Sequence, residues 1–236
     1  MATEVFAAPA PQPAGTSESF TVDGLASGMY YFAVRATDET GQRSELSNSV
    51  TAQVSPYAFT DDFNDGNADS WQEQEPADWN VIDTGSNWLY RASTLGMAAS
   101  WTGPLPLKDQ AIEADVRYAA GTYTCGLAFR GDGDMNSGSY YYFGIYPNEN
   151  KWKLYSVNGG DWGDVDNPLG QGDISLSPGT PYRLKAEATG NAVMLNINGQ
   201  PLMMQPIESS DHPWGKAGLW MAVGEVDYDN IIISGS

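Results

Sequence analysis

Apolar and polar side chains alternate with a period of two along most of the chain. In the run MYYFAVRATD, for example, Tyr30, Phe32 and Val34 share one face. This period is typical of β-strands with one buried face, and clusters of Gly, Asn, Asp and Pro separate the runs. In the C-terminal part we expect strands at 78–82, 87–92, 96–101, 110–118, 123–130, 139–146, 151–157, 181–188, 192–198, 201–205, 216–222 and 226–233. About a dozen short strands without a helical pattern predict an all-β fold, a two-sheet antiparallel β-sandwich of jelly-roll type.

The segment VSPYAF divides the chain into an N-terminal piece, residues 1–54, and a larger domain, residues 57–236. The N-terminal motif Gly24-Leu25-x-x-Gly28-x-Tyr30, followed by FAVRATDETGQRSELSNSV, resembles the last three strands of a fibronectin type III domain. In that family a leucine and a tyrosine form the corner before strand F. The resemblance covers about half of such a domain. We therefore expect a short N-terminal β segment that is the remnant of a partial fibronectin type III domain, a module that commonly serves as a spacer in multidomain extracellular proteins.

The larger domain contains seven separated stretches that fit one family pattern in order and spacing. They are DDFNDGNADSW, DWNVIDTGSNWLYRAS, AIEADVRY, CGLAFRGDG with YYYFGI, WKLYSVNGG, PYRLKAEATGNAVMLNINGQPL and DHPWGKAGLWMAVGEVDYDNIII. Together they resemble a concanavalin A-like domain of the laminin-G-like type. Such domains occur as carbohydrate-binding modules of secreted polysaccharide-degrading enzymes. The resemblance implies a secreted, extracellular protein with further domains, but this fold hosts many functions.

Charge and composition exclude some partners. The chain has 11 Lys and Arg against 30 Asp and Glu, a net charge of −19. Such a surface repels phosphate backbones, so we expect no nucleic-acid partner. No apolar run is long enough to insert into a membrane. The single cysteine, Cys125, rules out an internal disulfide and is expected in the core. The start MATEVFAAPAPQPAG has no signal-peptide pattern, so we expect a mature form or a piece of a larger secreted protein.

Catalytic motifs are incomplete. Glu113 and Asp115 in EADVRY are similar to the Glu-x-Asp start of a jelly-roll glucanase family. That family has a second glutamate a few residues further on, but here positions 117–119 are Arg, Tyr and Ala, so the catalytic glutamate is missing. Lyases of this fold use a Tyr–His pair with Arg and Gln, but nothing around the only histidine, His212, resembles their motifs. We predict no catalytic residue, and a glycoside hydrolase or polysaccharide lyase remains an alternative function.

A predicted outer sheet face combines small residues with tyrosines. By alternation, Thr124, Gly126, Ala128 and Arg130 share one face, and Tyr140 and Tyr142 match it on the next strand. Aromatic rings stack on the apolar faces of sugars, and polar groups hold their hydroxyls. The predicted ligand-binding residues are Arg130, Tyr140, Tyr142, Trp152, Tyr155, Asp161 and Trp162. Alternatively, the rings only cover the sheet, and Arg130 pairs with Asp132 or Asp134.

The acidic run FTDDFNDGNADSW offers many oxygens in one turn, which is what Ca²⁺ requires. Gly66 is misplaced for an EF-hand loop counted from Asp62. In the resembling family a structural Ca²⁺ often joins the first turn to the last strand. The resemblance therefore implies a structural Ca²⁺ held by Asp62, Asn64, Asp65, Asp227 and Asp229. The alternative is a turn whose Asx side chains bond their own backbone.

The leading hypothesis is a non-catalytic carbohydrate-binding module that targets a secreted polysaccharide-active protein to a polysaccharide or oligosaccharide. The first alternative is an enzyme of the same fold. The second is an extracellular adhesion or spacer domain without a glycan ligand, for which the Arg130-Gly131-Asp132 tripeptide is the only motif.

Overall fold

The computed structural model describes residues 5, 13, 16, 19–22, 25, 28–54, 57–75 and 78–236. Contacts divide the chain into two compact units, Met1–Pro56 with Ser236, and Tyr57–Gly235. Every regular element of the described residues is a β-strand and all strand pairs are antiparallel, which confirms the predicted all-β fold. Over the same ranges, no helix has both the length and the apolarity to cross a membrane.

The first unit contains one β-ribbon. Strands β1 (Gly28–Phe32) and β2 (Val50–Val54) pair with Gly28 opposite Val54. Beyond the strands, the ribbon continues through the bonds from Val34 N to Ser47 Oγ (2.9 Å) and from Ala36 N to Ser44 Oγ (3.0 Å). Gly24 and the segment 55–56 lie outside the described residues. The partial fibronectin type III domain therefore stays a prediction.

The second unit contains the remaining strands. They are β3 (Tyr57–Asp61), β4 (Trp71–Gln74), β5 (Trp79–Asp83), β6 (Trp88–Leu107), β7 (Gln110–Tyr118), β8 (Thr124–Gly131), β9 (Tyr140–Tyr146), β10 (Lys151–Val157), β11 (Gly170–Asp173), β12 (Tyr182–Thr189), β13 (Ala192–Ile197), β14 (Gln200–Pro201), β15 (Ile207–Glu208) and β16 (Gly215–Gly235). Strands β7 and β10 match their predicted bounds. The four strands predicted at 87–92, 96–101, 216–222 and 226–233 are instead merged into two, β6 and β16.

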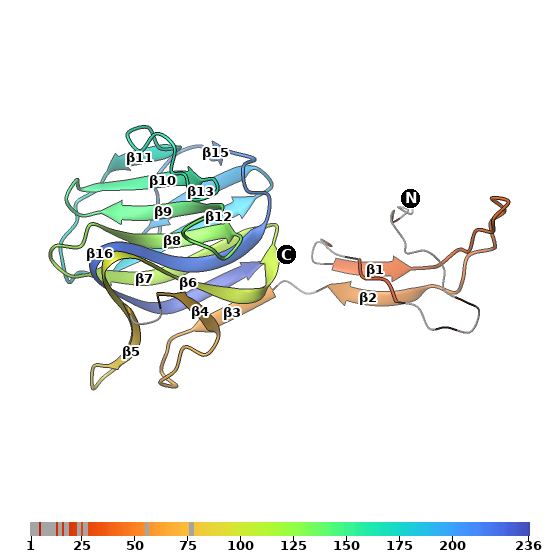
Figure 1. Ribbon diagram of the computed structural model, residues 1–236, viewed down its shortest axis with the longest axis horizontal. Coiled ribbons are helices and arrows are strands. Elements are labelled where there is room, and N and C mark those ends of the chain that lie inside the picture. Colours follow the sequence, from red (N-terminus) through yellow and green to blue (C-terminus); the bar gives the residue numbers. More distant parts are fainter. Residues whose placement is uncertain are drawn as a thin grey trace. The chain divides into compact units, whose positions relative to one another are not determined.

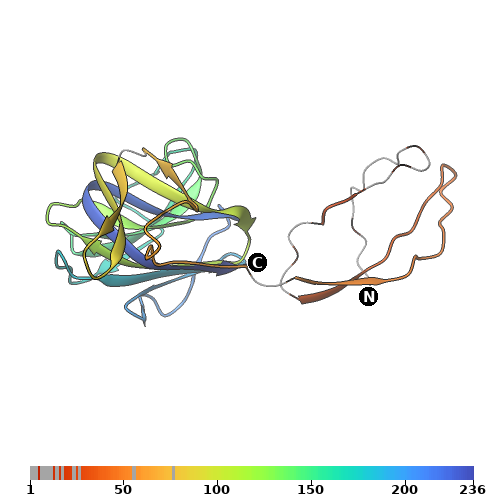
Figure 2. The same ribbon diagram turned by 90° about the horizontal axis from the view of Figure 1, so that it is seen from below.

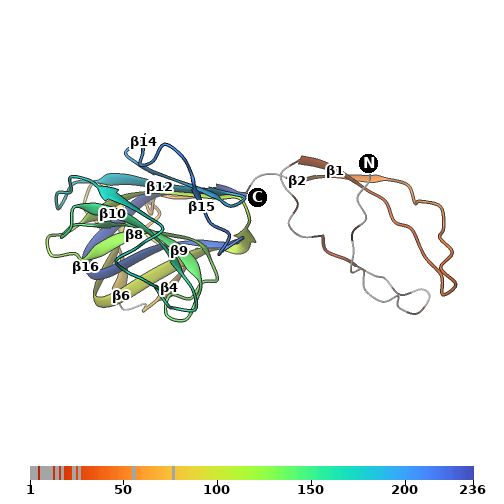
Figure 3. The same cartoon turned by 90° about the horizontal axis from the view of Figure 1, so that it is seen from above.

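The long strands β6 and β16 belong to both layers of the sandwich. The front sheet has the order β11-β10-β9-β8-β16-β6-β4, and the back sheet has β14-β13-β12-β7-β16, with β3, β6 and β5 beyond it. The strands change sheets at a bulge, where Leu95 and Gly96 oppose the single residue Val223 (φ 49°). Bulges bend strands in this way at sandwich corners. Figure 1 shows β8 to β11 side by side, and Figures 2 and 3 show the layers from two sides.

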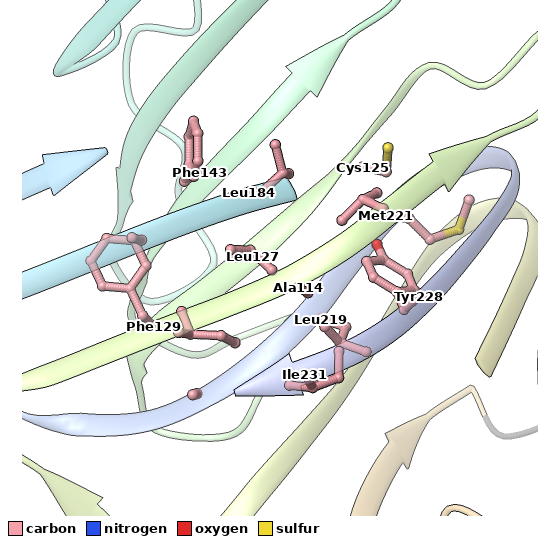
Figure 4. Packing of buried hydrophobic residues seen from close by; sticks show 14 of the residues in the cluster. Ala114, Cys125, Leu127, Phe129, Phe143, Leu184, Leu219, Met221, Tyr228 and Ile231 are labelled. Atoms are coloured by element: carbon pink, nitrogen blue, oxygen red, sulfur yellow. The ribbon is translucent and has the colours of Figure 1, made fainter. Parts of the chain in front are cut away.

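The main core lies between the two sheets. Leu127, Phe129 and Phe143 of the front sheet pack with Ala114 and Leu184 of the back sheet, and all are fully buried (Figure 4). Cys125 lies in the same layer as predicted, and burial raises the pKa of its thiol. This core fixes which faces of β8, β9 and β10 point outward.

Candidate functional site

The outer face of the front sheet carries a second aromatic cluster. Its buried members are Ala99, Trp101, Ala128, Met135, Tyr140, Tyr142, Tyr146, Tyr155, Val157, Trp220 and Ala222. The rings have room because β8 presents only Thr124, Gly126 and Ala128 beneath them, and Gly126 lies directly opposite Gly144. The structure thus brings together the predicted residues Tyr140, Tyr142 and Tyr155.

Trp162, from the loop between β10 and β11, covers this cluster. Its ring centroid lies 5.1 Å from that of Trp220 and 5.5 Å from those of Tyr142 and Tyr155. The loop is held by Tyr155 Oη, which donates to Val165 O (2.7 Å), and by Gly160 N, which donates to Gly138 O (2.7 Å). Tyr140, Tyr142 and Tyr155 are therefore buried under the protein's own loop. Trp162 is half-buried, and Asp161 is exposed.

Trp152 lies on the other side of the front sheet. It is three residues from Tyr155 on β10, so the alternation of a strand points the two side chains to opposite faces. Trp152 packs in the main core, with its ring centroid 6.5 Å from that of Phe143. This placement does not bring Trp152 to the outer face.

Arg130 also lies away from the aromatic face. Its backbone is left-handed (φ 50°) beside the register shift between Lys216 and Gly218. The fully buried guanidinium donates from Nη1 to Gly190 O (2.7 Å) and His212 O (3.3 Å), while Nη2 lies 3.7 Å from Asp109 Oδ1. Arg130 therefore links elements at the end of the sandwich rather than pairing with Asp132 or Asp134. Burial also makes the Arg130-Gly131-Asp132 tripeptide unsuited to adhesion.

Tyr123 is an exposed aromatic residue, although strict alternation with Cys125, Leu127 and Phe129 predicts it on the core face. β8 begins at Thr124, and the preceding loop turns Tyr123 outward, where it is 49% exposed beside Val223. Its ring begins a row of four aromatic rings, Tyr123, Tyr146, Tyr155 and Trp162. The distances between the centroids of successive rings in this row are 5.9, 6.3 and 5.5 Å. We call these four residues the aromatic strip. Its two ends, Tyr123 and Trp162, reach solvent, and the loop AAGT before Tyr123 was the only sequence signal for this.

The two carboxylates with a glucanase-like spacing are engaged elsewhere. Arg183 Nε donates to Glu113 Oε1 (2.7 Å), and Arg183 Nη1 lies 3.3 Å from Asp115 Oδ1. His212 is buried on Tyr141, and its Nε2 lies 3.0 Å from Ser156 Oγ. Burial lowers the pKa of His212, so its ring is neutral at pH 7.

The acidic turn lies next to the end of β16. Asp61, Asp62 and Asp65 line an open pocket of about 400 Å³ together with Asn230. Asp62 and Asp65 each accept a bond from the backbone N–H two residues on, at 3.1 Å, as in Asx turns. The first and last strands of the second unit are joined directly, because β3 pairs with residues 231–235 of β16.

The other residues of the predicted Ca²⁺ set differ in how many side-chain oxygens already accept hydrogen bonds and are therefore not available to an ion. Arg91 and Arg117 bond both oxygens of Asp227, each with a contact of 2.6 Å, so Asp227 does not fit a cation site. Asp229 Oδ2 accepts from Asn87 Nδ2 (2.7 Å), and Asn64 Oδ1 accepts from Trp88 N (3.4 Å). Within the described ranges, no three His, Cys, Asp or Glu side chains form a metal-holding group.

No protein-family model matches the sequence, and no curated protein matches it either. Solved structures do resemble it. The carbohydrate-binding module CBM66 from Bacillus subtilis has a TM-score of 0.57 at 16% identity, covering 69% of this chain and 93% of that chain. The cellulose induced protein Cip1 has a TM-score of 0.53 at 14% identity, covering 75% and 97%. A glycoside hydrolase family 16 endo-glucanase from Bacteroides ovatus has a TM-score of 0.53 at 13% identity, covering 74% and 99%. At such identities the likeness shows the jelly-roll fold alone.

Proposed function

We propose that the second unit is a non-catalytic carbohydrate-binding module that uses the aromatic strip. The carrying observation is a line of packed rings on a sheet face whose two ends, Tyr123 and Trp162, are accessible. Such rings stack on the apolar faces of sugars. The names of the similar structures, a carbohydrate-binding module and an endo-glucanase, support a glycan as ligand. In this proposal the unit holds a secreted, multidomain polysaccharide-active protein on its glycan.

The surroundings of the strip favour binding over hydrolysis. Glycoside hydrolysis needs two carboxyl groups that flank the scissile bond. The carboxylate of Glu149 near Tyr146 is paired with Lys153 at 2.8 Å, and Glu113 and Asp115 are paired with Arg183 on the back sheet. The exposed Asp161 and Asp164 beside Trp162 accept backbone N–H bonds within their own loop. We therefore expect no release of reducing sugar from any glycan that the protein binds.

The test is a binding panel of neutral and acidic polysaccharides, followed by calorimetry on soluble oligosaccharides. Tyr123→Ala should weaken binding by about 5- to 10-fold, because a lost aromatic contact is worth about 1 kcal/mol. Trp214→Ala removes an exposed aromatic residue outside the strip and should leave affinity unchanged. The proposal fails if no polysaccharide is bound, or if the two variants lose the same affinity.

We also propose that the acidic turn binds a structural Ca²⁺, with Asp62, Asn64, Asp65 and Asp229 as ligands. Burial, and then nearby aspartates including Asp62, raise the pKa of Asp61 and Asp229, whereas hydrogen bonds from Asn64 lower the pKa of Asp62 itself. A raised carboxyl pKa means that stability is lost as pH rises through the folded-state value. A bound cation relieves that repulsion where the carboxylates are ionised, and ties the turn to β16.

Calcium should therefore raise the melting temperature at pH 7 by about 5 °C at saturation, and chelator should reverse this. The rise should shrink as the pH falls through the raised pKa values of Asp61 and Asp229, because protonated carboxyls no longer attract the ion. In differential scanning calorimetry, calcium should not raise the melting temperature of the Asp62→Asn/Asp65→Asn variant. Asp69→Asn, an exposed residue of the same turn outside the ligand set, should behave as wild type. An identical melting temperature with calcium and with chelator rules out the structural ion.

A further inference from the structure

Carboxylates lie on both sides of Trp162, the accessible ring at one end of the strip. Asp161 precedes it and Asp164 follows two positions later, and both are exposed. Both are fixed in place, because Asp161 Oδ1 accepts from Gly163 N (2.9 Å) and Asp164 Oδ1 accepts from Asp166 N (3.1 Å). Neighbouring Cα atoms are about 4 Å apart, so these charges lie roughly within a Debye length of a sugar on Trp162.

The neighbouring loop adds further negative charge. It packs against the Trp162 loop through the bond from Gly160 N to Gly138 O. The Ser137 hydroxyl, followed by the N–H groups of Asn136 and Ser137, lowers the pKa of Asp134 to about 2. Asp134 is therefore ionised at any pH used for binding. Asp132 in the same loop accepts from Ser139 N (2.8 Å).

The cations near the strip are already engaged. The Lys153 ammonium lies 4.6 Å from the Tyr146 ring centroid and 2.8 Å from Glu149 Oε2. Lys216 donates to Gln72 Oε1 at 2.9 Å. Elsewhere in this unit, ion pairs with carboxylates hold Arg91, Arg117, Arg130, Lys151, Arg183 and Lys185. An acidic sugar on the strip would thus meet fixed carboxylates beside Trp162. Of the two nearby lysines, Lys153 is paired with Glu149, and Lys216 is hydrogen-bonded to the neutral amide of Gln72.

We infer that the aromatic strip selects uncharged glycans and rejects carboxylated or sulfated ones. This rests on the proposed function and adds the class of ligand. Like charges brought together without compensation oppose binding, and such repulsion is a source of specificity. The carboxylates do not repel a neutral chain, and its hydroxyls can donate hydrogen bonds to them. We expect at least about 10-fold discrimination between matched neutral and anionic chains at physiological salt.

The experiment measures retention in affinity gels of five neutral polymers and of their carboxymethylated forms. The neutral polymers are hydroxyethylcellulose, xylan, mannan, curdlan and inulin. Within each pair that is retained, the neutral form should bind at least about 10-fold more tightly at 0.15 M salt, and the gap should narrow at 1 M salt because screening is stronger. Equal or tighter binding of the carboxymethylated form overturns the inference but leaves the proposed function standing. Retention of no polymer in either form overturns both.

A pair of variants isolates the charges. In Asp161→Asn/Asp164→Asn the amide oxygen still accepts the backbone bond, so the turns are kept. This variant should reduce the ratio of neutral to anionic affinity by about 3-fold or more, because an anionic chain then no longer meets these two charges. Asp83→Asn/Glu208→Gln also removes two negative charges, but from exposed residues of the back sheet. It should leave the ratio of neutral to anionic affinity unchanged. If both double variants change the gap equally, net charge rather than the strip sets the selectivity, and the inference is overturned.

Discussion

Arg130→Ala is expected to destabilise the second unit by about 3–5 kcal/mol, because it leaves a large cavity and removes the donor of buried hydrogen bonds. The substitution leaves Gly190 O and His212 O without their donor and removes the cation facing Asp109. It also empties the volume of one of the largest fully buried side chains. Urea unfolding followed by tryptophan fluorescence measures the loss.

Arg130→Met is the matched control, because it fills much of the same space without a charge. Nε and Nη2 of Arg130 have no hydrogen-bond partner, so the native protein carries part of the cost of desolvating the guanidinium. Burial lowers the pKa of Arg130 for the same reason. Arg130→Met should therefore lose clearly less stability than Arg130→Ala. A loss below about 1 kcal/mol for Arg130→Ala would contradict a structural role for this residue.

Arg130 also illustrates what the alternation of apolar and polar residues cannot predict. Alternation predicts the bounds of β7 and β10 because both strands keep a period of two from end to end. It cannot predict the left-handed backbone at Arg130, which turns the side chain away from the face that Ala128 occupies. The same limit applies at Val223, where a bulge lets one strand serve two sheets. The fold class followed from the pattern, whereas these corners depend on pairing between strands far apart in sequence.

The candidate site was predictable to a similar extent. Alternation placed Tyr140 and Tyr142 on one outer face, because β9 is regular. It gave no information on the loop that lays Trp162 over them, since loop conformation depends on contacts such as Gly160 with Gly138. Alternation predicts that Asp227 and Asp229 share one side of β16, but it cannot predict the two arginines, Arg91 and Arg117, that bond the oxygens of Asp227.

Trp162→Ala is expected to give the largest loss of glycan affinity, about 30-fold, equivalent to an aromatic hot spot of about 2 kcal/mol. The substitution removes an accessible stacking ring and also uncovers Tyr142, Tyr155 and Trp220 beneath it. Those rings lose a packing partner, so a smaller loss of stability, about 1–2 kcal/mol, should accompany the loss of binding. Calorimetry on the glycan identified by the panel measures the first effect and urea unfolding the second.

Trp162→Phe separates the two effects, because a phenyl ring keeps much of the cover while offering less stacking surface. It should retain most of the stability and an intermediate affinity. Trp214→Ala, outside the strip, should change neither quantity. If Trp162→Ala binds glycan as tightly as wild type while losing stability, Trp162 is only a cover for the tyrosines. The binding site would then have to lie away from Trp162.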